Sequence, residues 1–287
     1  MRRFLRVSAI VLIALVLIAA VLIYGLLHGW YIKKHTPDEL ASLLKPYMQI
    51  KTPVGEGPFP TVIGFHGYHW MRDDAGRIPK GYEYWADYFA ELGYVSILVD
   101  SFSGRGIITQ EDLESRRLTF WGSERAGDVI VSLDEARKLS FVDVDQLALF
   151  GWSHGAWAIM DLFAMDPQNA LPTNLKTSSD QPLAGVKGAV LFYPYCNFPA
   201  KSRSRGWSQD IAVLMLMGGK DPLTEACLEI ASILKDNGQP VSTHVYPSAR
   251  HGFDAANEEL PNSHVNPEAT SDAREKVRNF LAQIFSK

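Results

Sequence analysis

The chain contains only two cysteines among its 287 residues, and no cluster of His, Cys, Asp or Glu has metal-ligand spacing. The sequence therefore implies no metal site. A strong charge imbalance is also missing, since the formal net charge is −4, and nucleic acid is not expected as a partner. No internal repeat or low-complexity segment interrupts the chain, and its hydrophobic share of 47% is that of an ordinary globular protein.

The first thirty residues differ from the rest. Residues Val7–Leu27 form a run of 21 positions without a formal charge, long enough for a helix of roughly 30 Å, the thickness of a bilayer's hydrocarbon core. Arginines precede this run and lysines follow it, and the excess on the N-terminal side predicts a cytoplasmic N-terminus. We therefore expect a single-pass membrane protein whose remaining chain lies outside the cytoplasm, with a cleaved signal peptide as the alternative.

Beyond this run the sequence predicts one three-layer α/β domain. Residues 1–34 are expected to form a membrane anchor, residues 35–60 a proline-containing linker and lead-in, and residues 61–287 the folded domain. Short, nearly continuous apolar runs alternate with helical patterns, which is typical of a mostly parallel sheet covered by helices on both faces. The expected strands cover residues 61–67, 94–100, 147–151, 188–194, 211–219 and 241–247.

The best-defined motif is Gly-x-Ser-x-Gly at Gly151, Ser153 and Gly155, which follows an apolar strand and precedes a helical segment. This is the pattern of the nucleophile elbow in an α/β-hydrolase fold. The serine there lies on a turn so tight that its backbone is strained, and side chains at the two glycines would collide with the neighbouring helix and strand. Ser153 is therefore the candidate nucleophile.

An acid and a base follow the serine in the order that this fold requires. Asp221 and His251 each come after a later predicted strand, and functional groups gather at the carboxyl ends of parallel strands. His251 would take the proton of the serine hydroxyl, and Asp221 would hold the imidazole in the right tautomer. Asp221 could instead only cap the helix that follows it. Asp100 and Asp254 are the weaker candidates for the acid.

Backbone N–H groups beside the elbow are the candidates for stabilising an oxyanion. One is the N–H of His154, which follows the nucleophile and begins a helix. The second is expected from the loop after the first predicted strand, at Gly67 or Tyr68. His66 is expected to shape this loop rather than to transfer a proton.

Candidates for substrate binding are less sharply defined. Arg105 is a loop residue that could recognise a carboxylate, as are Arg203 and Arg205. The alternative is that these arginines are solvated loop charges. An apolar acyl pocket is expected to be lined by Tyr68, Trp70, Trp152 and Tyr195. For Trp152, packing beneath the elbow is the alternative role.

With these motifs in this order, the chain resembles the dienelactone hydrolase family. The resemblance extends from Thr61 to Phe253 and rests on FHG, VDSFSGRG, GWSHG, LFYPYC, GGKDPLTEAC and ARHGF. It implies hydrolysis of a small carboxylic ester or lactone through an acyl-enzyme, without a cofactor, and its catalytic positions fall on Ser153, Asp221 and His251. The best-known members use a cysteine as nucleophile, so the serine favours a general ester hydrolase.

The two cysteines, Cys196 and Cys227, fit the same resemblance. The first follows a predicted strand, and the second lies in the helix after the next strand. If those strands are neighbours, as consecutive strands usually are, both thiols lie at the same edge of the sheet. We therefore expect a disulfide beside the active-site loops, with two free buried thiols as the alternative.

Two further functions share the same pattern of residues. A serine peptidase or acyltransferase of this fold has the same elbow and the same order of acid and base. A non-catalytic binding module could also retain the fold, although the intact set of three residues argues against it. No oligomeric state is predicted. The expected function is a serine hydrolase of a small ester or lactone whose catalytic domain acts outside the cytoplasm.

Overall fold

Helices and strands alternate along the chain in the computed structural model, which describes residues 2–69, 71–72, 76–116, 122–165, 171–208, 210–255 and 265–286. The helices are α1 (Arg2–Leu27), α2 (Pro37–Leu44), α3 (Lys80–Glu91), α4 (Gln110–Ser115), α5 (Gly122–Arg137), α6 (His154–Phe163), α7 (Thr224–Asp236) and α8 (Pro267–Phe285). The strands are β1 (Met48–Lys51), β2 (Phe59–Phe65), β3 (Val95–Val99), β4 (Val142–Trp152), β5 (Val186–Phe192), β6 (Ala212–Gly218) and β7 (Val241–Tyr246).

The strands form one sheet in the order β1-β3-β2-β4-β5-β6-β7. β1 pairs antiparallel with β3, and every other pair in this sheet is parallel. The mostly parallel sheet that the sequence predicted is therefore confirmed. Ser153, Asp221 and His251 follow β4, β6 and β7, so the topology brings them to the same edge of the sheet.

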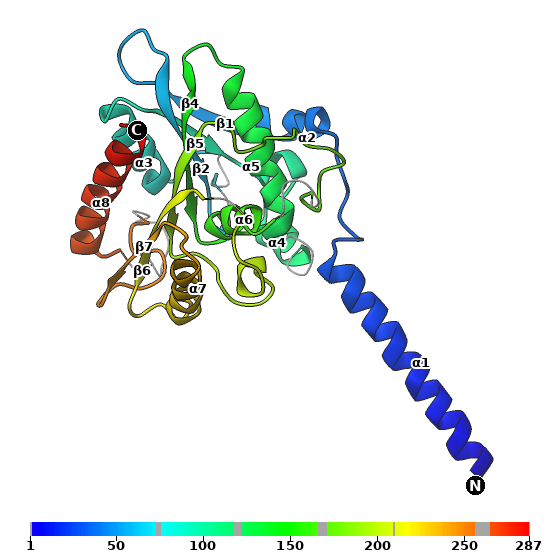
Figure 1. Cartoon of the computed structure of the whole chain (residues 1–287). Helices are drawn as coiled ribbons and strands as arrows, with labels where there is room; N and C mark the ends of the chain where they lie inside the picture. Colours follow the sequence, from blue (N-terminus) through cyan, green and yellow to red (C-terminus); the bar gives the residue numbers. More distant parts are fainter. Residues whose placement is uncertain are drawn as a thin grey trace.

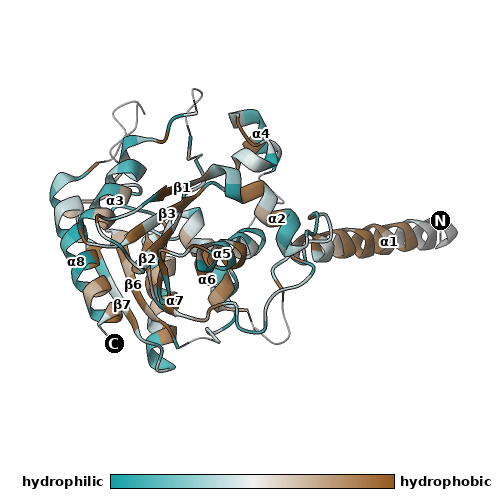
Figure 2. Ribbon diagram, turned by 90° about the horizontal axis from the view of Figure 1, so that it is seen from above, coloured by the Kyte–Doolittle hydropathy of each residue, from teal (hydrophilic) through white to brown (hydrophobic). Residues whose placement is uncertain are grey.

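Helices cover both faces of the sheet (Figure 1). α2, α5, α6 and α7 pack on one face, whereas α3 and α8 pack on the other. In β4, Leu147 and Leu149 belong to the first core, and Ala148 and Phe150 belong to the second. This alternation follows from the two-residue period of a strand and explains why strands buried on both faces are apolar throughout. Figure 2 shows hydrophobic strands at the centre and hydrophilic residues along α8.

The folded part begins earlier in the chain than the sequence indicated. α2 and β1 both lie inside residues 35–60, which the sequence indicated as a linker. α2 forms because Pro37 occupies its first turn, where no backbone N–H is needed, and because Thr36 and Glu39 form a capping box. β1 is a short edge strand with mostly exposed side chains, so it lacks the apolar run by which the buried strands were predicted.

The N-terminal helix α1 extends away from the sheet and its covering helices (Figure 1). Among the residues that the structure describes, no helix combines the length and the hydropathy that crossing a membrane requires. The predicted transmembrane helix over Val7–Leu27 is therefore wrong for the described part of the chain, and membrane anchoring through this helix is not supported there.

Cys196 and Cys227 form a disulfide that ties the loop after β5 to helix α7. β5 and β6 are neighbours in the sheet, so the loop after the first strand meets the helix after the second. The crosslink spans 31 positions, and closing a loop of that size stabilises a fold by about 3–4 kcal/mol, chiefly by restricting the unfolded chain. Disulfides persist in oxidising compartments, which favours a place of action outside the cytoplasm; that location stays a prediction.

Candidate active site

Ser153 lies on the turn between β4 and α6, in a backbone conformation that is unusual for a residue with a side chain. Its φ is 50° and its ψ is −107°, a strained conformation that costs of order 1–3 kcal/mol in a non-glycine residue. A Cβ on Gly155 would lie 2.0 Å from the carbonyl oxygen of Phe65, and a Cβ on Gly151 would lie 2.6 Å from the Cα of Ala156. The elbow therefore requires glycine at both positions, for the steric reason that the sequence suggested.

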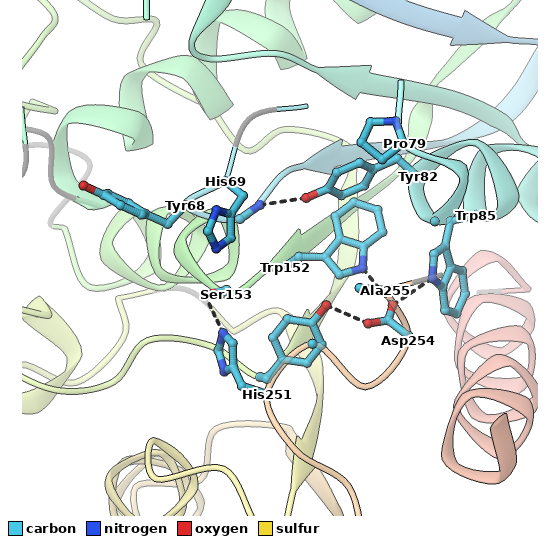
Figure 3. A pocket seen from close by; sticks show the side chains of 14 residues that line it. Tyr68, His69, Pro79, Tyr82, Trp85, Trp152, Ser153, His251, Asp254 and Ala255 are labelled. Carbon is cyan, nitrogen blue, oxygen red and sulfur yellow. Dashed lines mark hydrogen bonds between the residues drawn. The ribbon is translucent and has the colours of Figure 1, made fainter. Parts of the chain in front are cut away.

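Three side chains form a hydrogen-bonded chain at the carboxyl edge of the sheet. His251 Nε2 lies 2.9 Å from Ser153 Oγ, and His251 Nδ1 lies 2.6 Å from Asp221 Oδ2. Because an ionised carboxylate only accepts, Nδ1 carries the proton and Nε2 is left to accept from the serine hydroxyl. Asp221 is buried, and its other oxygen accepts from the Leu223 N–H at 2.9 Å. The structure thus brings the three predicted residues together in the order that proton transfer requires. Figure 3 shows the contact between Ser153 and His251.

The loop after β2 passes beside the elbow. A Cβ on Gly67 would lie 3.5 Å from the Cβ of Ser153, so the absence of a side chain lets the loop approach the nucleophile closely. The Gly67 N–H donates to the Tyr82 hydroxyl at 3.2 Å, and Tyr68 lines the same cavity as Ser153. The N–H of His154 is at the first position of α6, where a helix offers no internal acceptor. Both segments predicted to supply oxyanion donors therefore border Ser153.

A buried arginine that sequence reasoning missed holds this loop against the elbow. Arg125 on α5 donates through Nη1 to the carbonyl oxygen of His66 at 2.8 Å and through Nε to Ser101 Oγ at 3.1 Å. The same Nη1 lies 3.2 Å from His154 Nδ1. Because a guanidinium only donates, His154 Nδ1 accepts, and this imidazole faces Arg125 rather than the serine. Arg125 lies within a helical pattern and carries no motif of its own, so the sequence offered no signal for it.

His66 is a buried, neutral histidine in the same loop. Its Nε2 accepts from the Ser101 N–H at 3.1 Å, so Nδ1 carries the proton and faces the carbonyl oxygens of Gly67 and His69 at 2.8 and 3.0 Å. Burial, together with the nearby charge of Arg125, lowers the pKa of His66 to about 3. Its imidazole is therefore too weak a base to take a proton near neutral pH, and it shapes the loop as predicted.

The lowered pKa of His66 predicts a stability that falls in acid. The unfolded chain takes up this proton near pH 6.5, whereas the folded chain stays neutral down to a pKa of about 3. The stability contributed by neutral His66 is therefore complete above pH 6.5 and lost as the pH falls toward 3. Between about pH 7 and about pH 5 we expect a loss of about 2 kcal/mol in the free energy of unfolding. Urea unfolding of wild type and His66→Asn isolates this contribution, and an equal loss in both proteins would contradict it.

A cavity of about 200 Å³ lies beside Ser153 and His251 (Figure 3). Aromatic side chains form much of its wall: Tyr68, Tyr82, Trp85, Trp152 and Tyr193. Tyr193 follows β5 directly, has a φ of 35°, and its ring centroid lies 4.7 Å from that of His251. Its place at the end of a buried strand was the signal that could have identified Tyr193 as a residue of the cavity.

Among the described residues, no group of three or more His, Cys, Asp or Glu side chains could hold a metal ion.

The aromatic residues that the sequence proposed for the acyl pocket occupy different places. Trp152 lines the cavity and is also buried in the core, so its position is compatible with both of the roles considered for it. Tyr195 does not belong to the cavity wall, because its hydroxyl donates to the carbonyl oxygen of Phe198 at 2.8 Å and its ring packs on Trp157. Trp70 lies outside the described residues.

The three loop arginines also lie outside the wall of this cavity. Arg105 donates with two N–H groups to the Asp128 carboxylate, at 2.6 and 3.0 Å, and this ion pair is buried. Its partner lies on α5, 23 positions away, and no local pattern reveals such a pair. Arg203 and Arg205 are exposed, which agrees with the alternative that they are solvated loop charges. The structure therefore brings no arginine of this set to the serine.

The profile of the dienelactone hydrolase family matches residues 174–285. That region contains Asp221, His251 and the disulfide, while the elbow precedes it. The match confirms the resemblance to this family that the sequence suggested.

The individual proteins that match the chain do so at low sequence identity. The chain is 29% identical over 251 residues to dipeptidyl aminopeptidase BIII of Pseudoxanthomonas mexicana, a match that covers 80% of this chain and 34% of the peptidase. It thus spans about a third of that protein. A structure from Klebsiella pneumoniae assigned as a dienelactone hydrolase has a TM-score of 0.62 at 16% identity and covers 82% of this chain and 92% of that one. Esterase 2 of Thermogutta terrifontis, phosphorylated by paraoxon, has a TM-score of 0.59 at 17% identity over 83% and 88%. These two likenesses establish the fold.

Proposed function

We propose that this chain, a relative of the dienelactone hydrolases, is a carboxylic ester hydrolase with Ser153 as its nucleophile. The observation that carries the proposal is the hydrogen-bonded chain from Asp221 through His251 to Ser153, on a strained elbow beside a cavity. The cavity of about 200 Å³ is below the usual range for drug-sized ligands. A cavity of this size suits a small substrate, so the substrate that we propose is a small carboxylic ester or lactone.

Each group has a defined part in an acyl-enzyme mechanism. His251 Nε2 takes the hydroxyl proton while Ser153 Oγ attacks the ester carbonyl carbon, and Asp221 stabilises the imidazolium that forms. The oxyanion is stabilised by the backbone N–H of His154 and by a second backbone N–H from the loop at Gly67 or Tyr68. His251 then gives its proton to the leaving alcohol, which stays attached to the acyl group when the substrate is a lactone. Water activated by the same imidazole hydrolyses the acyl-enzyme and restores the serine.

Covalent labelling tests this proposal directly. We expect a fluorophosphonate probe to modify about one serine per chain and peptide mapping to find the label on Ser153, because His251 activates only this hydroxyl. Heat-denatured protein serves as the control and should remain unlabelled. The labelled protein should lose its turnover of 4-nitrophenyl acetate and butyrate. Absence of label from Ser153 in the folded protein would overturn the proposal.

A serine peptidase is the second candidate, because the likeness to dipeptidyl aminopeptidase BIII extends over 80% of this chain. It would use the same three side chains and would also be labelled at Ser153. The two functions differ in the bond that they cleave. Turnover of peptide amides, with no turnover of small esters or lactones, would favour the peptidase.

A further inference from the structure

Asp254 is a buried carboxylate on the wall of the cavity beside Ser153. The indole N–H groups of Trp85 and Trp152 donate to its Oδ2 at 2.8 and 3.0 Å. The hydroxyl of Tyr193 donates to its Oδ1 at 2.6 Å. All three donors are uncharged, so they orient the carboxylate without neutralising it.

No cation balances Asp254 in the part of the chain that the structure describes. Its polar contacts there are the three hydrogen bonds from neutral side chains and one from its own backbone N–H, and no lysine, arginine or histidine forms an ion pair with it. Burial raises the pKa of Asp254, and the hydrogen bonds act in the opposite direction. A buried carboxylate without a counter-charge is costly. A cation in the adjoining cavity would remove that cost.

The other walls of the cavity suit the same kind of group. Tyr82, Trp85, Trp152 and Tyr193 line it together with Asp254. Aromatic faces attract ammonium groups through the negative charge of their π systems, and this attraction grows when water is excluded. A neutral acyl chain needs no carboxylate beside it, and an anionic substrate would be repelled by one. Figure 3 shows Ser153 and His251 on one side of Trp152, with Asp254 beyond it.

From this arrangement we infer that the cavity binds an ammonium group, so the substrate is a small ester that carries a primary or quaternary ammonium a few bonds from its carbonyl carbon. The inference rests on the proposed ester hydrolysis, because Ser153 and Asp254 line one cavity. The carbonyl carbon lies at the serine, and the ammonium lies toward the carboxylate. This polarity is the reverse of the carboxylate recognition predicted for Arg105, which is paired outside the cavity wall.

Pairs of esters that differ only in charge test the inference. The ethyl ester of β-alanine and ethyl butyrate place the difference on the acyl side, whereas acetylcholine and 3,3-dimethylbutyl acetate place it on the alcohol side. We expect kcat/KM, measured by pH-stat, to favour the charged ester by about tenfold or more in at least one pair. The pair that shows the preference identifies the side of the ester that enters the cavity. A preference for the neutral ester in both pairs would overturn the inference.

Asp254→Asn removes the charge while it preserves the shape and the two indole hydrogen bonds. The amide oxygen can accept from both indoles, and the amide nitrogen can donate to the Tyr193 oxygen, while the Tyr193 O–H proton loses the acceptor that Asp254 gave it. We expect the ratio of kcat/KM between charged and neutral esters to fall about tenfold or more. The matched control is Asp161→Asn, which removes a buried carboxyl outside the cavity wall and should leave the ratio unchanged. An unchanged ratio in Asp254→Asn would overturn the inference.

A binding measurement separates failure of this inference from failure of the proposed function. Ethylammonium and tetramethylammonium chloride are titrated into Ser153→Ala protein by calorimetry at constant ionic strength, and the titration is repeated with Asp254→Asn added. Saturable binding that this second substitution abolishes supports the ammonium site even if no ester is cleaved. Ester cleavage without such binding and without a charge preference overturns the ammonium site and leaves the hydrolase proposal standing.

Discussion

Alanine in place of Ser153 is expected to lower kcat for ester hydrolysis by about five to six orders of magnitude. The substitution removes the oxygen that would form the acyl-enzyme, whereas the backbone donors and the cavity remain. The remaining rate reflects binding and oxyanion stabilisation alone. Steady-state kinetics with a 4-nitrophenyl ester measure the loss, and the thermal unfolding midpoint shows that the variant is folded.

His251→Ala should lower kcat by about as much as Ser153→Ala does. The double variant, with both residues replaced by alanine, should lower kcat hardly more than either single variant. When two residues act together in one proton transfer, the effects of their substitutions on kcat are strongly non-additive, because the first substitution already abolishes that transfer. Two losses that multiply would show that Ser153 and His251 act separately. That result would contradict the role given to their 2.9 Å contact.

Asp221→Asn is expected to lower kcat by about four orders of magnitude while the fold is kept. The asparagine oxygen can still accept from the Leu223 N–H, which now bonds to Asp221 Oδ1 at 2.9 Å. The amide nitrogen would then face His251 Nδ1 and force it to accept. The proton would move to Nε2, the nitrogen that must receive the serine proton, so the imidazole would be held in the wrong tautomer.

The pH profile distinguishes this effect from a simple loss of stability. In Asp221→Asn the residual kcat should rise with pH as hydroxide replaces the lost base, whereas the wild-type rate should level off. Urea unfolding of both proteins at neutral pH provides the control for folding. A loss of less than about tenfold in kcat would contradict the assignment. Asp254, the acid three residues beyond the histidine, would then have to be reconsidered.

How much the sequence could predict depended on how local each signal was. Ser153, Asp221 and His251 each follow a strand that is visible as an apolar run, and a parallel sheet places such ends at one edge. Gly151 was predictable for the same reason, since a Cβ there would clash with Ala156, five positions away. Gly155 was predictable from the motif alone, because its clash is with the distant Phe65. The strands predicted in the folded domain overlap the observed ones, although β4 begins five residues before the predicted range 147–151.

Residues whose roles depend on distant partners were not predictable. Asp254 was considered only as a weaker acid, because its partners Trp85 and Trp152 lie 169 and 102 positions away. Arg105 was assigned to a substrate carboxylate because nothing near it in the chain reveals Asp128. The transmembrane prediction over Val7–Leu27 relied on a count of uncharged residues, and the described part of the structure does not support it.

The strained turn at Ser153 has a consequence for the evolution of this chain. A backbone held at a φ of 50° would be relaxed by glycine, so the most stable version of this turn is one without a nucleophile. Selection for stability alone therefore favours loss of the hydroxyl, and selection for turnover opposes it. A serine at this position marks a compromise in which part of the folding free energy is given up to present one oxygen atom.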